Sequence, residues 1–118
     1  MKRAPIAFLW DDQQACAAID TFVSGVDLRH YEADLLLRSA VERQLQNIGE
    51  DLSQLSKIDP AVAARVPRQR QPIGFRNVLV HVYAGLNQPE IWRVLHENLP
   101  ALHAAVTALV DELSPLAP

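Results

Sequence analysis

The amino-acid sequence predicts an all-α protein, an up-and-down bundle of four or five helices in a single domain spanning residues 1–118. Three observations predict this fold class. The length is that of one ordinary domain. Apolar residues make up 49% of the chain and aromatic residues only 6%, so the core must be built mainly from aliphatic side chains, which suits helix packing. Along several segments, apolar residues recur every three or four positions, which is the helical period.

The first predicted helix runs from Pro5 to Ser24, and its apolar residues broadly follow the helical period. Proline is favoured in the first turn of a helix, where its missing N–H costs nothing, so Pro5 suits the start. Glycine is favoured just after the last turn, so Gly25 suits the stop.

A second helical segment begins near Asp27 and continues to about Lys57. Residues 29–33 are a candidate separate turn ahead of the long helix. Gly49 interrupts the long helix and would let a neighbouring helix approach closely. The steps of three and four residues predict a seam that packs on partner helices. The seam consists of Leu37, Val41, Leu45, Ile48, Leu52 and Leu55.

Residues 59–72 form a connector with three prolines, in which 61–65 can make one short helical turn. A third core helix is predicted from Ile73 to Ala84 or Gly85. The last helix is predicted over residues 89–113, and Pro100 should kink it or split it in two because proline cannot donate an interior hydrogen bond.

The third predicted helix carries the most informative residues, G-F-R-N-V-L-V-H-V-Y-A-G at positions 74–85. At 100° per residue its larger apolar side chains gather on one arc that would face the core. Arg76, Asn77, His81 and Tyr83 all fall outside that arc, and no carboxylate lies among them. Because arginine can bind a phosphate through two hydrogen bonds and histidine transfers protons near neutral pH, this face suits an anionic ligand.

These side chains match the needs of RNA backbone cleavage. A base must deprotonate the 2′-hydroxyl, an acid must protonate the leaving oxygen, and a cation must stabilise the charge that develops on the phosphate. None of these steps requires a metal, so neither a metal nor a cofactor is expected. One imidazole cannot be base and acid at the same instant, so we predict a homodimer in which His81 of a second copy supplies the other role. The alternative is a solvated helix face on which His81 bonds to a neighbour.

The segment I-G-F-R-N-V-L-V-H-V-Y-A-G, followed by N-Q-P-E-I-W, resembles the R-x4-H-x-Y region of the HepT-like family within the HEPN superfamily. Residues 39–50, S-A-V-E-R-Q-L-Q-N-I-G-E, are similar to the long helix of that family. Residues 97–102, E-N-L-P-A-L, resemble its closing helix, and the opening M-K-R also fits. The resemblance covers nearly the whole chain, in order and at suitable spacing.

This resemblance implies a dimeric HEPN bundle that acts as a metal-independent endoribonuclease. It implies a toxin of a type II/VII-like toxin–antitoxin pair, silenced by a cognate minimal nucleotidyltransferase antitoxin. Carried over by position, Arg76 and His81 are the catalytic pair and Asn77 supports them. Tyr83 matches the tyrosine that the antitoxin can adenylylate in family members, a modification whose bulk and negative charge would block a phosphate backbone. Simple occlusion by the antitoxin is the alternative means of neutralisation.

Five further charged residues are candidates for supporting roles. Arg65, Arg68 and Arg70 precede the motif and are candidates to guide RNA phosphates, with a solvated basic loop as the alternative. Arg43 and Glu50 are candidates to orient the catalytic pair from the long helix, with an ordinary surface or interhelical ion pair as the alternative.

The remaining chemistry-bearing residues have structural interpretations. Cys16, the one cysteine, is predicted to be a buried thiol, and the lack of a possible internal disulfide favours a reducing, cytoplasmic location. No apolar stretch is long enough to cross a membrane. With a net charge of −3, any contact with nucleic acid must come from a local patch. Surface or boundary positions are expected for His30, His96 and His103. Core or interface packing is expected for Trp10 and Trp92.

Three functions therefore compete. The first is an RNA-cleaving toxin. The second is a catalytically inactive HEPN-like helical binding module that docks a nucleotidyltransferase partner. The third is a helical interaction domain with no role in nucleic-acid chemistry. The presence of Arg76, His81 and Tyr83 on one face favours the first.

Overall fold

A computed structural model of the chain describes residues 4–66 and 88–114, and these residues form helices and no strand. The all-α prediction is therefore confirmed for the described part of the chain. The predicted third core helix, residues 73–85, lies outside it. The described helices are α1 (Pro5–Val23), α2 (Leu28–Ala33), α3 (Leu35–Ile58), α4 (Pro60–Ala63), α6 (Gln88–Glu97) and α7 (Leu99–Leu113).

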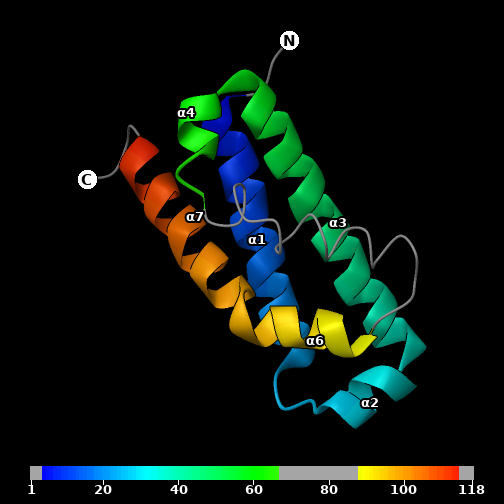
Figure 1. The fold of residues 1–118 in the computed structure, drawn as a ribbon. Coiled ribbons are helices and arrows are strands. Elements are labelled where there is room, and N and C mark those ends of the chain that lie inside the picture. Colours follow the sequence, from blue (N-terminus) through cyan, green and yellow to red (C-terminus); the bar gives the residue numbers. More distant parts are fainter. Residues whose placement is uncertain (1–3, 67–87, 115–118) are drawn as a thin grey trace.

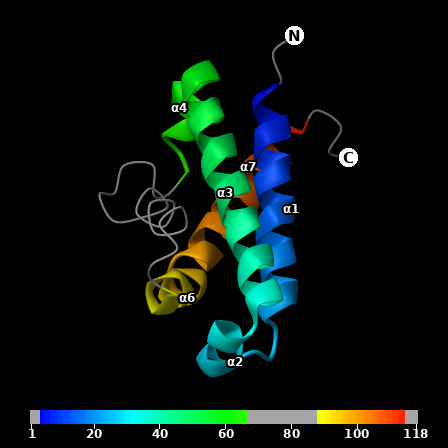
Figure 2. The same ribbon diagram turned by 90° about the vertical axis from the view of Figure 1, so that its right-hand side faces the viewer.

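Three long helices form the body of the bundle. α1 packs against both α3 and α7, as Figure 1 shows. The short helices lie at the ends: α4 follows the last turn of α3 at one end, while α2 and α6 lie at the other, where α2 also contacts α6. The view turned by 90° in Figure 2 shows the same arrangement, with α6 above α2. None of the described helices is long and apolar enough to cross a membrane.

The ends of α1 follow the residues that predict them. Pro5 occupies the first turn, where no backbone N–H is needed. The helix ends at Val23, and Gly25 has a φ of 72°, a left-handed conformation that costs little only in glycine. The chain can therefore turn sharply toward α2, and the predicted bounds, Pro5 to Ser24, agree with the structure to within one residue.

Aspartate side chains start the next three helices. The carboxylate of Asp27 accepts a hydrogen bond from the backbone N–H of His30 at 2.8 Å, and that of Asp34 accepts from Leu37 at 3.0 Å. Each cap satisfies a backbone donor that the helix itself leaves unpaired. Because Asp34 both ends α2 and caps α3, the candidate separate turn before the long helix is confirmed. Asp59 starts α4 in the same way.

The predicted seam of α3 forms one wall of the core. Val41, Leu45, Ile48, Leu52 and Leu55 are buried, and Leu37 packs against the core from a half-buried position. They belong to the same core cluster as the buried side chains of α1 and α7, and α3 packs directly on α1. Burial of each large aliphatic side chain stabilises the fold by about 1.5–3 kcal/mol relative to exposure, so this seam dominates the packing energy of α3.

Pro100 splits the predicted last helix in two. α6 ends at Glu97 and α7 begins at Leu99, so Pro100 lies in the first turn of α7, where its missing N–H leaves no hydrogen bond broken. The break lets α6 turn away across the end of the bundle, above α2, while α7 runs alongside α1 (Figures 1 and 2).

Candidate functional site

The predicted motif lies between two helices that the structure does describe. Arg76, Asn77, His81 and Tyr83 fall in residues 67–87, outside the described residues, as do the RNA-approach candidates Arg68 and Arg70. Their roles therefore stay predictions. The described residues that flank this segment are the buried Val66 before it and Gln88, the first residue of α6, after it.

The start of the connector is tied to the last turns of α7. The guanidinium of Arg65 donates two hydrogen bonds to the carboxylate of Glu112, from Nη1 to Oε1 at 2.9 Å and from Nη2 to Oε2 at 2.6 Å. This two-pronged geometry matches the shapes of the two groups. The hydrogen bonds and the charge of Arg65 lower the pKa of the Glu112 carboxyl. An RNA phosphate would have to compete with Glu112 for Arg65, whose role as a guide for RNA stays a prediction.

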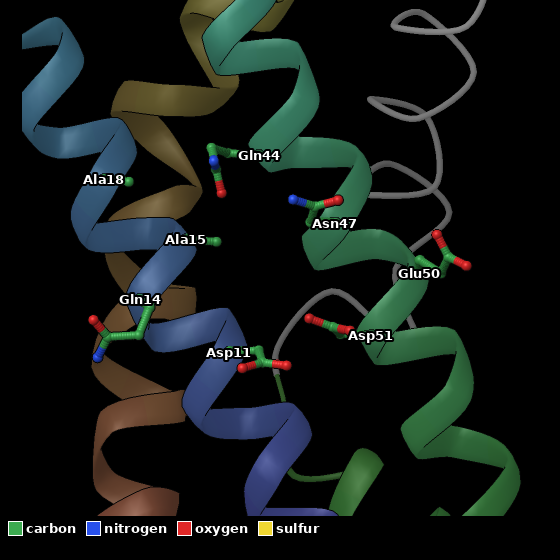
Figure 3. A pocket seen from close by; sticks show the side chains of 8 residues that line it. All are labelled: Asp11, Gln14, Ala15, Ala18, Gln44, Asn47, Glu50 and Asp51. Carbon is green, nitrogen blue, oxygen red and sulfur yellow. The ribbon is translucent and has the colours of Figure 1, made fainter. Parts of the chain in front are cut away.

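A polar groove of about 450 Å³ is lined by residues of α1 and α3. In Figure 3, Asp11 and Asp51 point toward one another across it, and Gln44 and Asn47 extend from α3 toward the small side chains of α1. The groove is lined by Asp11, Gln14, Ala15, Ala18, Gln44, Asn47, Glu50 and Asp51. Three of these residues are acidic and none is basic, so the lining of this groove supplies no cation that could bind a phosphate.

Both orienting candidates on α3 are exposed. Glu50 is at the edge of the α1–α3 groove, where its side chain points away from Asp11 and Asp51 (Figure 3). Arg43 lies two turns earlier on the same helix. Neither forms an ion pair with another residue in the described part of the chain, so the proposed role of each in orienting the motif stays a prediction.

A buried carboxylate on α1 escaped the sequence prediction. Asp12 is fully buried, one turn from Cys16. The sequence did contain a signal for this burial. Asp12 lies three residues after Leu9 and four residues before Cys16, which places it on the inward-facing stripe of α1. Burial raises the pKa of the Cys16 thiol to about 12, and the charges of Asp12 and Asp20 add to the rise. The thiol therefore stays protonated near neutral pH, which confirms the buried structural cysteine.

The two tryptophans differ in their environments. Trp92 is half-buried and packs against the core, with its ring centroid 5.0 Å from that of the buried Tyr31 and 4.4 Å from that of His96. Core packing is thus confirmed for Trp92. For Trp10 it is wrong: 53% of the residue is exposed, because Phe8 and Leu9 take the inward positions of that turn. An interface role for Trp10 stays a prediction.

The three histidines of the described part lie at the surface or its boundary, as expected. His30 is exposed and lies 3.6 Å from Asp34, and His103 is half-buried and lies 3.3 Å from Asp20. The exposed His96 ring contacts the backbone oxygen of Trp92, with Nδ1 at 2.9 Å. Within residues 4–66 and 88–114, no group of three or more His, Cys, Asp or Glu side chains is arranged to hold a metal ion.

The described helices form a small all-α bundle, and this architecture, with an R-x4-H-x-Y sequence between α4 and α6, is consistent with a protein of the HEPN type. A family model described as "Ribonuclease HepT-like" matches residues 13–109. The chain therefore belongs to the HepT-like family, and the resemblance noted from the sequence is confirmed.

Several relatives match over nearly their whole length. A protein of Methanocaldococcus jannaschii, provisionally named an RNase, is 28% identical over 105 residues, which cover 89% of this chain and 95% of the relative. Another provisionally named RNase, from Caldanaerobacter subterraneus subsp. tengcongensis, is 27% identical, with 93% of this chain and 97% of the relative covered. A probable ribonuclease HepT of Thermococcus cleftensis is 26% identical, with 86% and 92% covered. No solved structure shows a significant match to the chain.

Proposed function

We propose that this protein is an endoribonuclease that cleaves RNA without a metal ion, with Arg76 and His81 as its catalytic pair. One observation carries the proposal: the chain belongs to the ribonuclease HepT-like family over residues 13–109, and that range contains an intact R-x4-H-x-Y sequence. The names of the relatives, which describe ribonucleases, support the same reaction class.

The proposed reaction divides between the two side chains. A neutral His81 imidazole takes the proton of a ribose 2′-hydroxyl, whose oxygen attacks the adjacent phosphorus. The bond from phosphorus to the 5′-oxygen of the next nucleotide breaks, and a protonated imidazole gives that oxygen its proton. Arg76 donates hydrogen bonds to the phosphate oxygens, on which negative charge grows during the attack. Asn77 supports the arrangement of the pair.

The second imidazole is proposed to come from a second copy of the chain. In a symmetric homodimer the same polar face of each copy meets its equivalent, so both copies bring a His81 to one site. One imidazole can then act as base while the other acts as acid. Sedimentation at the concentrations used for cleavage tests this part, because a monomer with undiminished activity would contradict it.

The proposed biological setting is a toxin–antitoxin pair. A cognate minimal nucleotidyltransferase would silence the toxin by adenylylating Tyr83, which lies two residues from His81 in the sequence. The added phosphate would place negative charge where the RNA backbone must bind, and the two charges repel each other.

The deciding experiment is RNA cleavage by the purified protein in EDTA, comparing the wild type with His81→Ala. His96→Ala is the matched control, because His96 is an exposed histidine on α6. The mass of the intact protein is measured on the same samples, since an adenylylated Tyr83 would make an active enzyme look inactive. We expect the wild type and His96→Ala to cut and His81→Ala to lose at least about 100-fold in rate. An unmodified wild type that cuts no RNA would favour the inactive binding module.

A further inference from the structure

Two covered polar atoms lie on α2 and α6, two helices that contact each other. Tyr31 is fully buried, and its hydroxyl has no hydrogen-bond partner among the described residues. The side-chain oxygen of Gln88, on a half-buried residue, is likewise covered and without such a partner. Leaving a buried polar group unsatisfied opposes folding, so most such groups in proteins are bonded to protein or to an ordered water.

The packing of Trp92 brings the two residues to the same junction. The Tyr31 ring lies 5.0 Å from the Trp92 ring, centroid to centroid. Gln88 precedes Trp92 by four residues in α6, so the two side chains share one face of that helix. α2 and α6 contact each other, and both views of the fold show α6 above α2 (Figures 1 and 2).

The chemistry of the two atoms is complementary. Burial raises the pKa of the Tyr31 phenol well above its usual range, and the nearby charge of Glu42 adds to the rise. The hydroxyl therefore keeps its proton and can donate, while an amide oxygen such as that of Gln88 can only accept. A phenylalanine would fill the same space without burying a hydroxyl, so packing alone does not account for a tyrosine at this position.

We propose that Tyr31 is a positioning residue: its hydroxyl, bridged by one internal water to the side-chain oxygen of Gln88, fixes the first turn of α6. A bridging water accounts for two polar groups that share a junction without a direct bond. Gln88 directly follows residues 67–87, which contain Arg76 and His81, so this joint fixes the described residue to which the motif segment is attached. The effect on cleavage rests on the proposed ribonuclease function; the joint itself does not.

A double-mutant cycle tests the joint without any assay of activity. The variants are Tyr31→Phe, Gln88→Met and the double variant, each of which keeps roughly the size of the side chain it replaces. We expect Tyr31→Phe to shift the unfolding equilibrium toward the unfolded state by roughly two- to tenfold, and the double variant to shift it by less than the product of the single shifts. A Tyr31→Phe protein as stable as the wild type or more so, or shifts that simply multiply, would overturn the joint.

Cleavage kinetics test the positioning role. We expect Tyr31→Phe to lower kcat by roughly tenfold or more with little change in KM, because a slight displacement of reacting groups is costly. Ile19→Val is the matched control: it removes one methylene from a fully buried residue of α1 and should destabilise the protein comparably while leaving kcat unchanged. If the cycle shows that Tyr31 and Gln88 are coupled but Tyr31→Phe leaves kcat unchanged, the positioning role is overturned. If the wild type cuts no RNA, the proposed function fails, but the double-mutant cycle still tests whether Tyr31 and Gln88 interact.

Discussion

The helical framework and residues 67–87 differ sharply in charge. All 14 acidic residues of the chain lie in the framework that the structure describes, together with only six of the 11 lysines and arginines. Residues 67–87 contain no acidic residue, and they contain Arg68, Arg70, Arg76 and His81. A net charge of −3 for the whole chain therefore conceals an acidic body and a basic segment.

Two framework arginines are already engaged in ion pairs. Arg65 is held by Glu112, and Arg93 is held between Glu90 and Glu97 on α6. The α1–α3 groove adds three carboxylates. The acidic residues outnumber the basic ones in the described body, so the difference teaches that contacts with phosphate are expected mainly in residues 67–87.

The largest expected effect comes from a substitution in residues 67–87 that removes activity and leaves the stability of the framework unchanged. Arg76→Ala should lower the RNA cleavage rate by roughly 10²–10³-fold, because it removes the cation that stabilises the charged transition state. Arg76→Lys keeps the charge but loses the two-pronged hydrogen bonding, so it should recover only part of the rate. Cleavage kinetics and thermal unfolding are measured on the same samples. A normal rate for Arg76→Ala would contradict the catalytic assignment.

The converse substitution destabilises the framework and leaves residues 67–87 unchanged. Leu45→Ala removes a fully buried side chain from the seam of α3 and should lower the free energy of unfolding by about 2–5 kcal/mol. Urea titration measures this loss. Cleavage per folded molecule, assayed well below the melting temperature, should stay close to that of the wild type. An equal loss from Leu36→Ala, at an 81% exposed position, would show that the seam does not carry the packing energy.

The framework could be predicted from the sequence because its signals are local. Three- and four-residue steps marked the seam of α3, Pro100 marked the break between α6 and α7, and Gly25 marked the turn after α1. What escaped prediction depends on tertiary packing. The burial of Asp12, the exposure of Trp10 and the pairing of Arg65 with Glu112 each depend on which neighbouring helix covers a given position.

Much less of the site could be derived from the residues alone. An arginine and a histidine five positions apart are common in helical proteins, so the spacing of Arg76 and His81 indicated chemistry only weakly. The family resemblance added the reaction class, and the match over residues 13–109 confirmed the family. The assignment of individual site residues awaits the variants described above.

The three arginines around the connector offer a graded comparison. Arg68→Gln and Arg70→Gln should each reduce the slope of log affinity against log salt concentration by up to about 0.7, the value for one lost contact to single-stranded RNA. Arg65→Gln should change the slope less, because Arg65 is paired with Glu112. Binding of a short RNA to the inactive His81→Ala protein is measured by fluorescence anisotropy. A slope change for Arg65→Gln as large as those of the other two would show that the ion pair opens for RNA.

The smallest expected effect concerns the ion pair itself. Arg65 holds the pKa of the Glu112 carboxyl below its usual value in the folded protein. A lowered folded-state pKa means that the pair stabilises the fold above the pKa of the unfolded state, about 4.3 for glutamate, and that this contribution is lost as the pH falls through the folded-state value. Because both side chains are exposed, the effect on the free energy of unfolding should be small and should shrink in high salt.

Glu112→Gln measures this contribution. The variant should be slightly less stable than the wild type at pH 7. The free energies of unfolding of the two proteins should converge as the pH falls below the pKa of the free carboxyl and on through the lower pKa of the folded state. Thermal unfolding is followed between pH 3 and 7, with Asp111→Gln as the neighbouring control on α7. A gap as large at pH 3 as at pH 7 would mean that Glu112 stabilises α7 by some means other than its charge. Equal pH profiles for Glu112→Gln and the wild type would mean that Arg65 is as available to RNA as Arg68 and Arg70, and the framework would then contribute a cation to the basic segment.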